Sequence, residues 1–332
     1  RDITTDQFGF YNLDIRKVLE AVYVNYQGNK ECEDFIAMTI YLKRIWFSNG
    51  IYHHYGSEKF APEFSPAFLL DAMKSIEPSL LPLAKGETVD GLFDRLKSAI
   101  FDPSFLPKKV NKADGCDLVA TSACNFYHNV SQHEVEDYYS SLKATVEKNP
   151  PSFGLNSRLV KQNGELIEQV WKIDGMYSKA IEIIVSYLRQ AAEYAENEQQ
   201  QKIISLLISY YQTGDLRVFD KYSIEWLKEQ DGRIDFINGF IEVYNDPLGL
   251  KASWEGIVEY KDLVATRRTR TISDNAQWFE DNSPVDSRFK KKIVKGVTAN
   301  VVCAAMLGGD EYPSTAIGIN LPNADWIRAE HG

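Results

Sequence analysis

Apolar residues recur at helical spacing through the first half of the chain, which predicts a series of amphipathic helices. The segments that show this spacing are residues 12–25, 32–47, 67–76 and 88–100. Ser65 followed by Pro66 is typical of an N-cap and the first residue of a helix. Ser131 with Glu134 forms a capping box, which predicts a further helix that runs to about Lys148.

The pattern changes after a pair of prolines near the middle of the chain. Residues 158–172 alternate around Asn163-Gly164, a dipeptide that favours the tight turn of a β-hairpin. Two longer helical patterns follow, at residues 176–196 and 199–212. We therefore expect a hairpin followed by a pair of long helices.

Strand patterns gather late in the sequence. They cover residues 234–244, 254–260, 297–306 and 316–321. A turn built on residues 246–249 joins the first two, and the charged segment 262–295 is predicted to be helical with a break at Ser283-Pro284. The predicted fold class is α+β, rich in helices, with a small β core assembled late in the chain.

The composition argues against two classes of partner, nucleic acids and membranes. The 332 residues carry a formal net charge of −10, and the two dense basic clusters, at residues 267–270 and 290–292, lie near acidic residues. A nucleic-acid partner is therefore not expected, because binding to phosphates needs a basic face. No apolar run approaches the ~20 residues of a membrane span, so no membrane partner is expected either. None of the four cysteines forms a CxxC pair, which favours free thiols in a reducing compartment.

No complete catalytic motif is present. Five histidines occur but none in an HExxH pair, and Asp137 stands where His133-Glu134 would need a second histidine. Neither a GxSxG elbow nor a P-loop appears, and Gly308-Gly309-Asp310-Glu311 is interpreted as a turn. The residues alone indicate an acidic α+β protein without a metal site in this chain.

Four segments resemble the dipeptidyl-peptidase III family and occur in the family's order. They are SNG through YGSEKFAP at 48–62, YQTG at 211–214, FIEVYNDPLG with WEG at 240–256, and GINLPN at 318–323. The resemblance extends from about Trp46 to Asn323. It departs from the family pattern at Val243 and Asn245, where serine and arginine are usual, and at residues 314–317. These departures put the peptide preference in doubt.

The resemblance implies one part of a two-lobed zinc exopeptidase. In that family a helical lobe binds zinc through an HExxGH motif, and the other lobe grips the peptide with a barrel-like β core. Residues 1–262 are expected to form the peptide-binding lower lobe, 263–297 to cross into the zinc lobe, and 298–332 to return to the β core. The chain is expected to be an internal piece that stops before the zinc motif, so that zinc belongs to the full-length parent and not to this chain.

The resemblance also implies roles for individual residues. Glu242 matches the glutamate that binds the peptide's free α-amine, and Tyr244 matches a tyrosine that donates to the oxyanion. Asn320 and Asn323 match asparagines that hold the amine end and the peptide backbone. Ala316, Ile317 and Gly318 belong to the strand expected to pair with the peptide. If residues 234–244 form one strand, Glu242 and Tyr244 share a face.

The implied function is the release of dipeptides from short peptides with a free N-terminus, by a cytoplasmic enzyme. This chain alone is expected to be inactive, because it depends on the zinc-bearing lobe. One alternative is a non-catalytic scaffold that binds peptides or a protein partner. For the site residues, the alternative is that Glu242 and Tyr244 serve only the turn that follows them, and that residues 320–323 are a simple strand exit.

Overall fold

The computed structural model describes residues 1–294, 296, 299–312 and 316–331. Within these ranges the chain forms twelve α-helices and six strands, and the strands make two separate three-stranded sheets. The predicted α+β class is therefore confirmed. The late β core is an open sheet in the described residues, because its two outer strands do not pair with each other.

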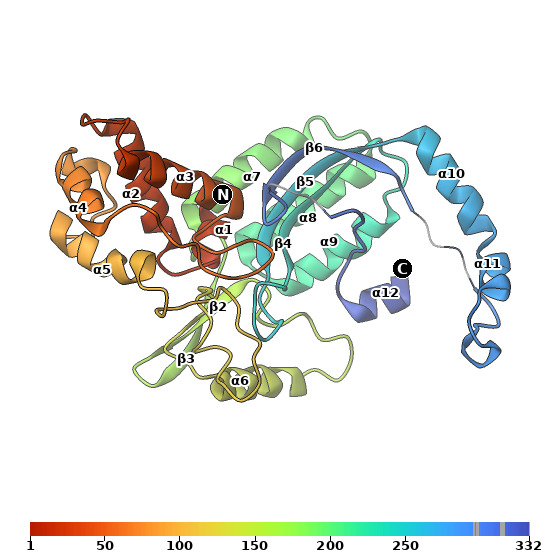
Figure 1. Cartoon of the computed structure of the whole chain (residues 1–332). Coiled ribbons are helices and arrows are strands. Elements are labelled where there is room, and N and C mark those ends of the chain that lie inside the picture. The colour runs from red at the N-terminus through yellow and green to blue at the C-terminus, as the bar shows by residue number, and fades with distance from the viewer. Residues whose placement is uncertain (295, 297–298, 313–315, 332) are drawn as a thin grey trace.

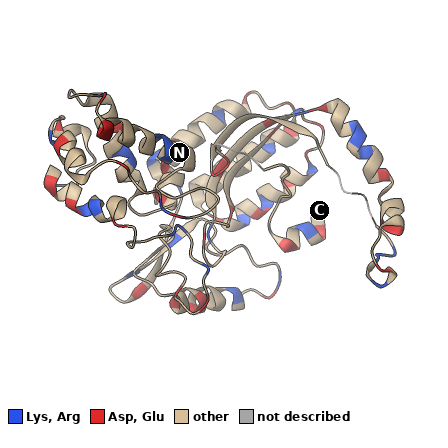
Figure 2. Cartoon of the chain, in the orientation of Figure 1, with Lys and Arg blue, Asp and Glu red and all other residues tan. Residues whose placement is uncertain are grey.

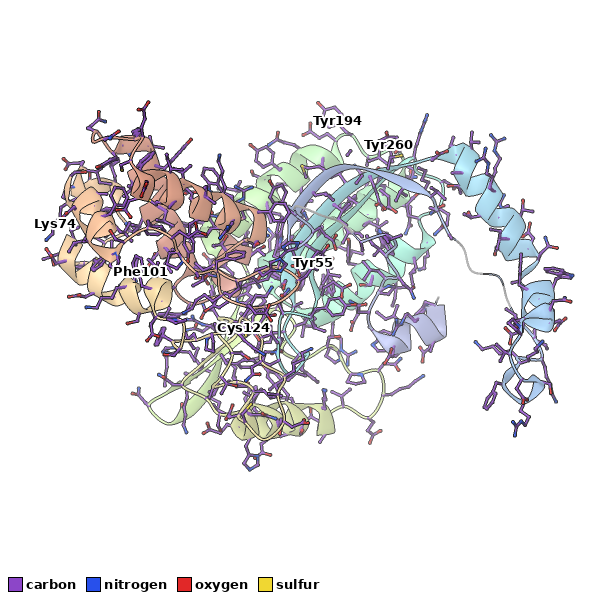
Figure 3. The ribbon with its side chains drawn as sticks, in the orientation of Figure 1. Tyr55, Lys74, Phe101, Cys124, Tyr194 and Tyr260 are labelled. Carbon is purple, nitrogen blue, oxygen red and sulfur yellow. The ribbon has the colours of Figure 1, made fainter. Side chains whose placement is uncertain are left out.

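The N-terminal third is helical and has its own core. Its helices are α1 (Asp2–Gln7), α2 (Asn12–Asn25), α3 (Glu33–Ser48), α4 (Pro66–Lys74) and α5 (Val89–Phe101). Ser65 caps α4 by accepting a hydrogen bond from the backbone N–H of Phe68, as its sequence predicts. The buried apolar faces of α2 to α5 pack against one another. Phe101, labelled in Figure 3, packs against this core.

A small mixed sheet and one helix follow. They are β1 (Tyr127–His128), α6 (Gln132–Ala144), β2 (Ser157–Gln162) and β3 (Glu165–Val170), with β1 parallel and β3 antiparallel to β2. The capping box at Ser131 is present, although α6 ends at Ala144, before the predicted Lys148. Asn163 and Gly164 have φ values of 52° and 88°, which is the geometry of the predicted hairpin turn.

Three helices cover the second sheet (Figure 1). The helices are α7 (Ser178–Ala192), α8 (Glu198–Thr213) and α9 (Leu216–Lys228), and the strands are β4 (Ile234–Glu242), β5 (Ser253–Lys261) and β6 (Val302–Gly309). The strands are antiparallel in the order β4-β5-β6. Phe240 of β4 and Trp171 pack at 4.8 Å between ring centroids inside the larger core. Cys124, labelled in Figure 3, belongs to this second core.

Helix α9 was not expected from the sequence. Its signals are present nevertheless, because Asp215 caps the helix and Leu216, Phe219 and Trp226 recur at helical spacing. The predicted helix at 262–295 is two helices, α10 (Leu263–Asp274) and α11 (Ala276–Asn282), with a 3₁₀ turn at Ser287–Phe289.

Helices α10 and α11 extend away from the rest of the chain, whereas the C-terminal helix α12 (Asp325–His331) lies close to α9 (Figure 1). Neither α10 nor α11 has a buried residue. Lysine and arginine are interspersed with acidic residues over the helices (Figure 2). No helix in the described ranges is both long and apolar enough to cross a membrane.

Two strand predictions differ from the structure. The strand predicted at 297–306 is β6 at Val302–Gly309, and residues 297 and 298 lie outside the described residues. The segment 316–321 is not a strand among the described residues. The physical reason is that a strand needs a partner for its backbone hydrogen bonds, and Ile317 here is fully exposed to solvent.

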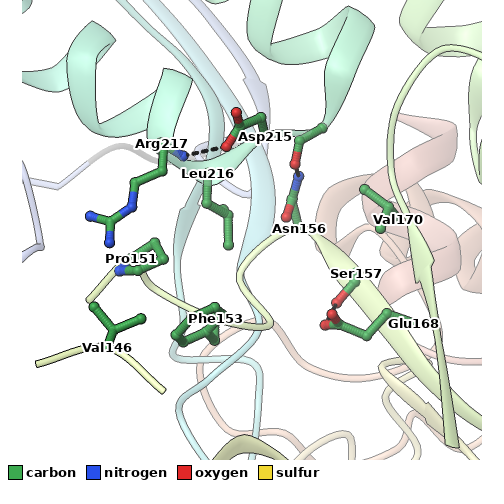
Figure 4. A pocket seen from close by; sticks show the side chains of 11 residues that line it. Val146, Pro151, Phe153, Asn156, Ser157, Glu168, Val170, Asp215, Leu216 and Arg217 are labelled. Atoms are coloured by element: carbon green, nitrogen blue, oxygen red, sulfur yellow. Dashed lines mark hydrogen bonds between the residues drawn. The ribbon is translucent and has the colours of Figure 1, made fainter. Parts of the chain in front are cut away.

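A buried lysine, Lys251, lies just before β5 and connects this part of the chain to α6 and the small sheet. The ammonium group of Lys251 donates hydrogen bonds to the Tyr139 hydroxyl at 2.7 Å and to the Ser157 hydroxyl at 3.3 Å. Both hydroxyl groups also donate to the Glu168 carboxylate, at 2.7 and 2.6 Å. Ser157 and Glu168 line an open hollow of about 370 Å³ at the start of α9 (Figure 4). Burial lowers the pKa of Lys251 to about 8, and Glu168 and Asp246 oppose that effect.

We expect Lys251→Met to lower the free energy of unfolding by about 3 kcal/mol, because it leaves buried acceptors without their cation. Lys161→Met is the control, since it removes a more exposed ion pair with Glu134 and should cost less than ~1 kcal/mol. Urea denaturation followed by circular dichroism measures both. Equal effects of the two substitutions would contradict a structural role for the Lys251 cluster.

Candidate functional site

The end of β4 carries the residues predicted to bind a peptide amine. The strand pairing is irregular between Phe240 and Glu242, where β4 ends. The side-chain amide of Asn323 donates a hydrogen bond to the carbonyl oxygen of Ile241 at 3.3 Å. The same side chain also lies close enough to the Glu242 carboxyl group to oppose the rise in its pKa that burial causes. Two candidate residues that are distant in sequence therefore lie together at this end of the sheet.

Three further acidic residues lie near Glu242. The strand register places Glu255 of β5 opposite Gly309, the last residue of β6, so Asp310 and Glu311 follow directly after that pair. The four acidic residues form what we call the carboxylate cluster: Glu242, Glu255, Asp310 and Glu311. Burial above all, and then the charges of the other three, raise the pKa of Glu255 to about 9.

Glu255 is the most constrained member of the cluster. Glu255 is only 2% exposed, and its Oε2 atom accepts no hydrogen bond from the described residues. Burial also raises the pKa of Glu242, an effect that Asn323 opposes and the charge of Glu311 reinforces. A buried carboxylate without donors is costly, so burial favours the protonated form of Glu255.

One cation already faces the cluster from the N-terminal region. Lys109 is buried, and its ammonium group lies 4.2 Å from the ring centroid of Phe8. Burial lowers the pKa of Lys109, and the charge of Asp310 opposes that shift. Burial raises the pKa of Asp310 to about 6, and Lys109 opposes it. Asp310 also accepts a hydrogen bond from the Asn245 side chain at 2.8 Å. The acidic side chains outnumber this cation.

The early matched segment supports the turn after β6. The side-chain amide of Asn49 donates hydrogen bonds to the carbonyl oxygens of Gly309 at 3.0 Å and Tyr312 at 3.1 Å. Gly309 has a φ of 65°, and a Cβ atom there would lie 2.2 Å from the carbonyl oxygen of Trp254. Both constraints hold the turn that carries Asp310 close to β5.

Side chains from the N-terminal helix and from α8 hold Trp254, the residue before Glu255. Gln7 accepts a hydrogen bond from the Trp254 backbone N–H at 2.9 Å, and Thr4 donates to its carbonyl oxygen at 3.1 Å. The indole N–H donates to the Tyr211 hydroxyl at 2.9 Å, and that hydroxyl donates to Asn238 of β4 at 2.6 Å. Tyr211, in the matched segment at 211–214, thus connects α8 to both β5 and β4.

The other candidate residues lie outside the carboxylate cluster or next to it. Tyr244 is 74% exposed and lies in the turn after β4, so the expectation that it shares a strand face with Glu242 is wrong, because the strand ends two residues earlier. Asn320 and Gly318 are exposed. The backbone N–H of Ala316 donates to Glu311 at 3.4 Å. Residues 314 and 315, where the sequence departs from the family pattern, lie outside the described residues.

The described residues contain no group of three or more His, Cys, Asp or Glu side chains arranged to hold a metal ion. This includes the carboxylate cluster, whose members are close enough to affect one another's pKa.

Sequence reasoning missed Glu255, Asp310 and Glu311. The signal for Glu255 was available, because it stands inside the matched motif at 254–256. The other two were assigned only to a turn, which is where they lie, since the N–H of Tyr312 bonds to the carbonyl oxygen of Gly309 at 3.2 Å. Only the register between β5 and β6 brings them to Glu255.

A family model, that of peptidase family M49, matches residues 120–332. The chain belongs to this peptidase family. Dipeptidyl peptidase 3 of Dictyostelium discoideum is 22% identical over 97% of this chain and 46% of the relative. The Mus musculus protein of the same name is 24% identical over 90% of this chain and 43% of its own length. The resemblance to the dipeptidyl-peptidase III family is confirmed.

The solved structure of DPP III from Caldithrix abyssi shares the fold, with a TM-score of 0.67 and 18% identity. It aligns with 99% of this chain and with 50% of its own chain. The dipeptidyl-peptidase III from Corallococcus sp. strain EGB gives a TM-score of 0.58 at 16% identity, over all of this chain and 53% of that chain. The M49 chain described here thus spans about half the length of the relatives that it matches.

The buried carboxyl of Glu255 predicts how stability depends on pH. Its pKa is raised from 4.5 to about 9 by folding, so the folded state holds a proton that the unfolded state releases between these values. The free energy of unfolding should therefore fall as pH rises from about 5 to 9. Glu255→Gln should flatten this slope and raise the free energy of unfolding at pH 7 by about 3 kcal/mol.

Urea denaturation at pH 5, 7 and 9 measures the effect, and the exposed Glu165→Gln serves as the control with a change below ~0.5 kcal/mol. A Glu255→Gln variant with an unchanged pH slope would contradict the protonated state of Glu255.

Proposed function

We propose that this chain is the peptide-binding part of a zinc-dependent dipeptidyl peptidase that releases dipeptides from the free N-terminus of short peptides. Membership of peptidase family M49 supports the reaction class. The observation that carries the proposal is the pairing of Glu242 with Asn323 beside three further acidic residues. We also propose a cytoplasmic location, which the four free cysteines support.

Amine recognition follows from the charge of the site. An ammonium group donates three hydrogen bonds, and a carboxylate that accepts one in a partly buried site forms a charge-assisted bond. Glu242 is the proposed acceptor, with Asn323 orienting it. Burial first, and then the charges of neighbouring acids, raise the pKa of Glu242 and Glu255. A bound cation would lower both pKa values and be held by more than one negative charge.

The peptide backbone would lie along the segment that follows the cluster. Residues 316–320 are exposed and belong to no sheet among the described residues. Their backbone groups, apart from the Ala316 N–H that donates to Glu311, would be available to pair with an extended peptide. Ala316, Ile317 and Gly318 are the proposed pairing residues, and Asn320 is the proposed contact to the backbone. Pairing with the peptide would supply the partner strand that this segment lacks among the described residues.

Tyr244 is the proposed oxyanion donor. Its exposed position in the turn after β4 would let its hydroxyl group reach a carbonyl presented by the bound peptide. In the parent enzyme, zinc would polarise the scissile carbonyl and activate water. The residues of this chain would bind and orient the substrate, and we expect this chain alone to be catalytically inactive.

We propose the lobe organisation stated above: residues 1–262 bind the peptide, 263–297 cross into the zinc lobe, and 298–332 return. Exposed apolar side chains in residues 263–297 are evidence for the proposal that this segment crosses into another lobe. Ile272, Trp278, Phe279 and Phe289 are all about half exposed or more. Such a concentration of apolar surface favours a partner, and the proposed partner is the zinc-bearing lobe.

The amine site can be tested by titrating this chain with a tetrapeptide and with its N-acetylated form. The free-amine peptide should bind at least tenfold more tightly, because acetylation removes the charge that Glu242 recognises. Glu242→Gln should abolish that difference. Glu259→Gln is the matched control, because Glu259 is a buried acid on β5, about 13 Å along the strand from Glu255.

Isothermal titration calorimetry gives the affinities, and release of arylamine from a dipeptidyl-arylamide reports turnover in the same samples. Binding with no turnover is the expected result. If Glu242→Gln bound both peptides like the unaltered chain, Glu242 would not be the amine acceptor. Turnover by this chain alone would contradict the proposed dependence on a second lobe.

The crossing segment should be unprotected in this chain. We expect fast amide hydrogen exchange over residues 263–282, and a change below ~0.5 kcal/mol in the free energy of unfolding for Trp278→Ala. Phe240→Ala in the core should cost about 4 kcal/mol for comparison. In a longer chain that carries the zinc lobe, exchange over 263–282 should slow by at least tenfold. Equal exchange in both chains would argue against the proposed covering lobe.

A further inference from the structure

A small cavity lies between α9, β4 and the segment that leads into α12. Its volume is about 60 Å³, and its walls are mostly apolar, including Tyr222, Trp226, Ile237 and Ile327. None of the four residues of the carboxylate cluster lines it. One acidic side chain does, that of Asp220 on α9.

Asp220 is buried without adequate hydrogen-bond donors. It is 7% exposed, and its Oδ2 atom accepts no hydrogen bond from the described residues. The guanidinium group of Arg217 lies 3.6 Å from Oδ2, beyond the usual range of a hydrogen bond. That group donates instead to the carbonyl oxygen of Asn149 at 2.6 Å. Arg217 therefore compensates the buried carboxylate only in part.

The cavity walls favour one kind of ligand. The aromatic rings of Phe219, Tyr222 and Trp226 suit a cation, and the aliphatic side chains around them suit an alkyl group. Water molecules would satisfy Asp220 but would leave the apolar walls in contact with water. A volume of about 60 Å³ holds roughly four waters at ~15 Å³ each, which corresponds to a ligand of four or five heavy atoms.

We propose that this cavity is a binding site for a small alkylammonium ion, with the Asp220 carboxylate as its partner. The ammonium group donates to Oδ2, which lacks a donor in the described residues, and the alkyl group covers the side chains of β4 and α12. The anion of this site is supplied by α9 and not by the carboxylate cluster, although Asn323, which is proposed to orient Glu242, also lines the cavity.

Isobutylammonium chloride is the probe, titrated into the 15N-labelled chain at pH 7.5. We expect saturable amide shifts in α9 and around Ile327, with a Kd in the millimolar range that suits so small a ligand. Isobutanol has nearly the same shape without the charge and should bind at least tenfold more weakly. This comparison needs no variant and so does not depend on how a substitution affects folding.

Two substitutions test which carboxylate binds the ammonium group of the probe. Asp220→Asn should weaken binding at least tenfold, whereas Asp215→Asn should leave it within twofold, because asparagine can still cap α9. The titration is repeated in Glu242→Gln, in which the α9 shifts should persist. Failure of the proposed amine site would therefore leave this result unchanged.

Three outcomes would overturn the proposal. The first is the absence of saturable shifts in α9, and the second is equal affinity for isobutanol, which would make the cavity a neutral apolar one. The third is loss of the α9 shifts in Glu242→Gln, which would place the probe in the carboxylate cluster instead.

Discussion

Acidic residues concentrated at one end of the β4-β5-β6 sheet set the constraint on which the candidate site depends. Glu255 is almost fully buried and Asp310 faces it from the turn after β6. Taking such groups out of water is costly unless they are neutral or meet a cation. Lys109 supplies one positive charge from the N-terminal region. The remaining acidic side chains are the basis for the proposal that this end of the sheet binds an ammonium group.

Much of the N-terminal part of the chain maintains this arrangement. Asn49 fixes the turn that carries Asp310, and Gln7 holds the start of β5. Residues separated by about 250 positions in sequence are thereby connected through single hydrogen bonds. The early matched segment consequently has a structural role, because Asn49 hydrogen-bonds the turn that carries Asp310.

The parts of the fold governed by local chemistry could be predicted from the sequence. Helix α2 has the predicted bounds, and the Ser131 capping box and the Asn163-Gly164 turn occur as expected. These features depend on residues a few positions apart. Helix α9 also has an ordinary cap, Asp215, and helical spacing of its apolar residues, so local chemistry is sufficient to predict it.

The carboxylate cluster could not be predicted in this way. It depends on the register of β5 with β6, two strands separated by the whole of α10 and α11. The contact of Asn323 with the end of β4 also depends on tertiary packing. The position of Tyr244 does not follow from alternation, because β4 ends at Glu242. Long-range register and strand termination are set by tertiary packing, which sequence periodicity does not contain.

The most direct measurement is a titration of the Glu255 side-chain carboxyl carbon by 13C NMR, with and without a saturating tetrapeptide that has a free amine. The account predicts a midpoint near the pKa of about 9 in the peptide-free chain, and a clearly lower midpoint when the ammonium group is bound. A midpoint near 4.5 in the free chain would contradict the burial of an uncompensated carboxyl at this site. A midpoint that the peptide leaves unchanged would contradict the link between the carboxylate cluster and amine binding.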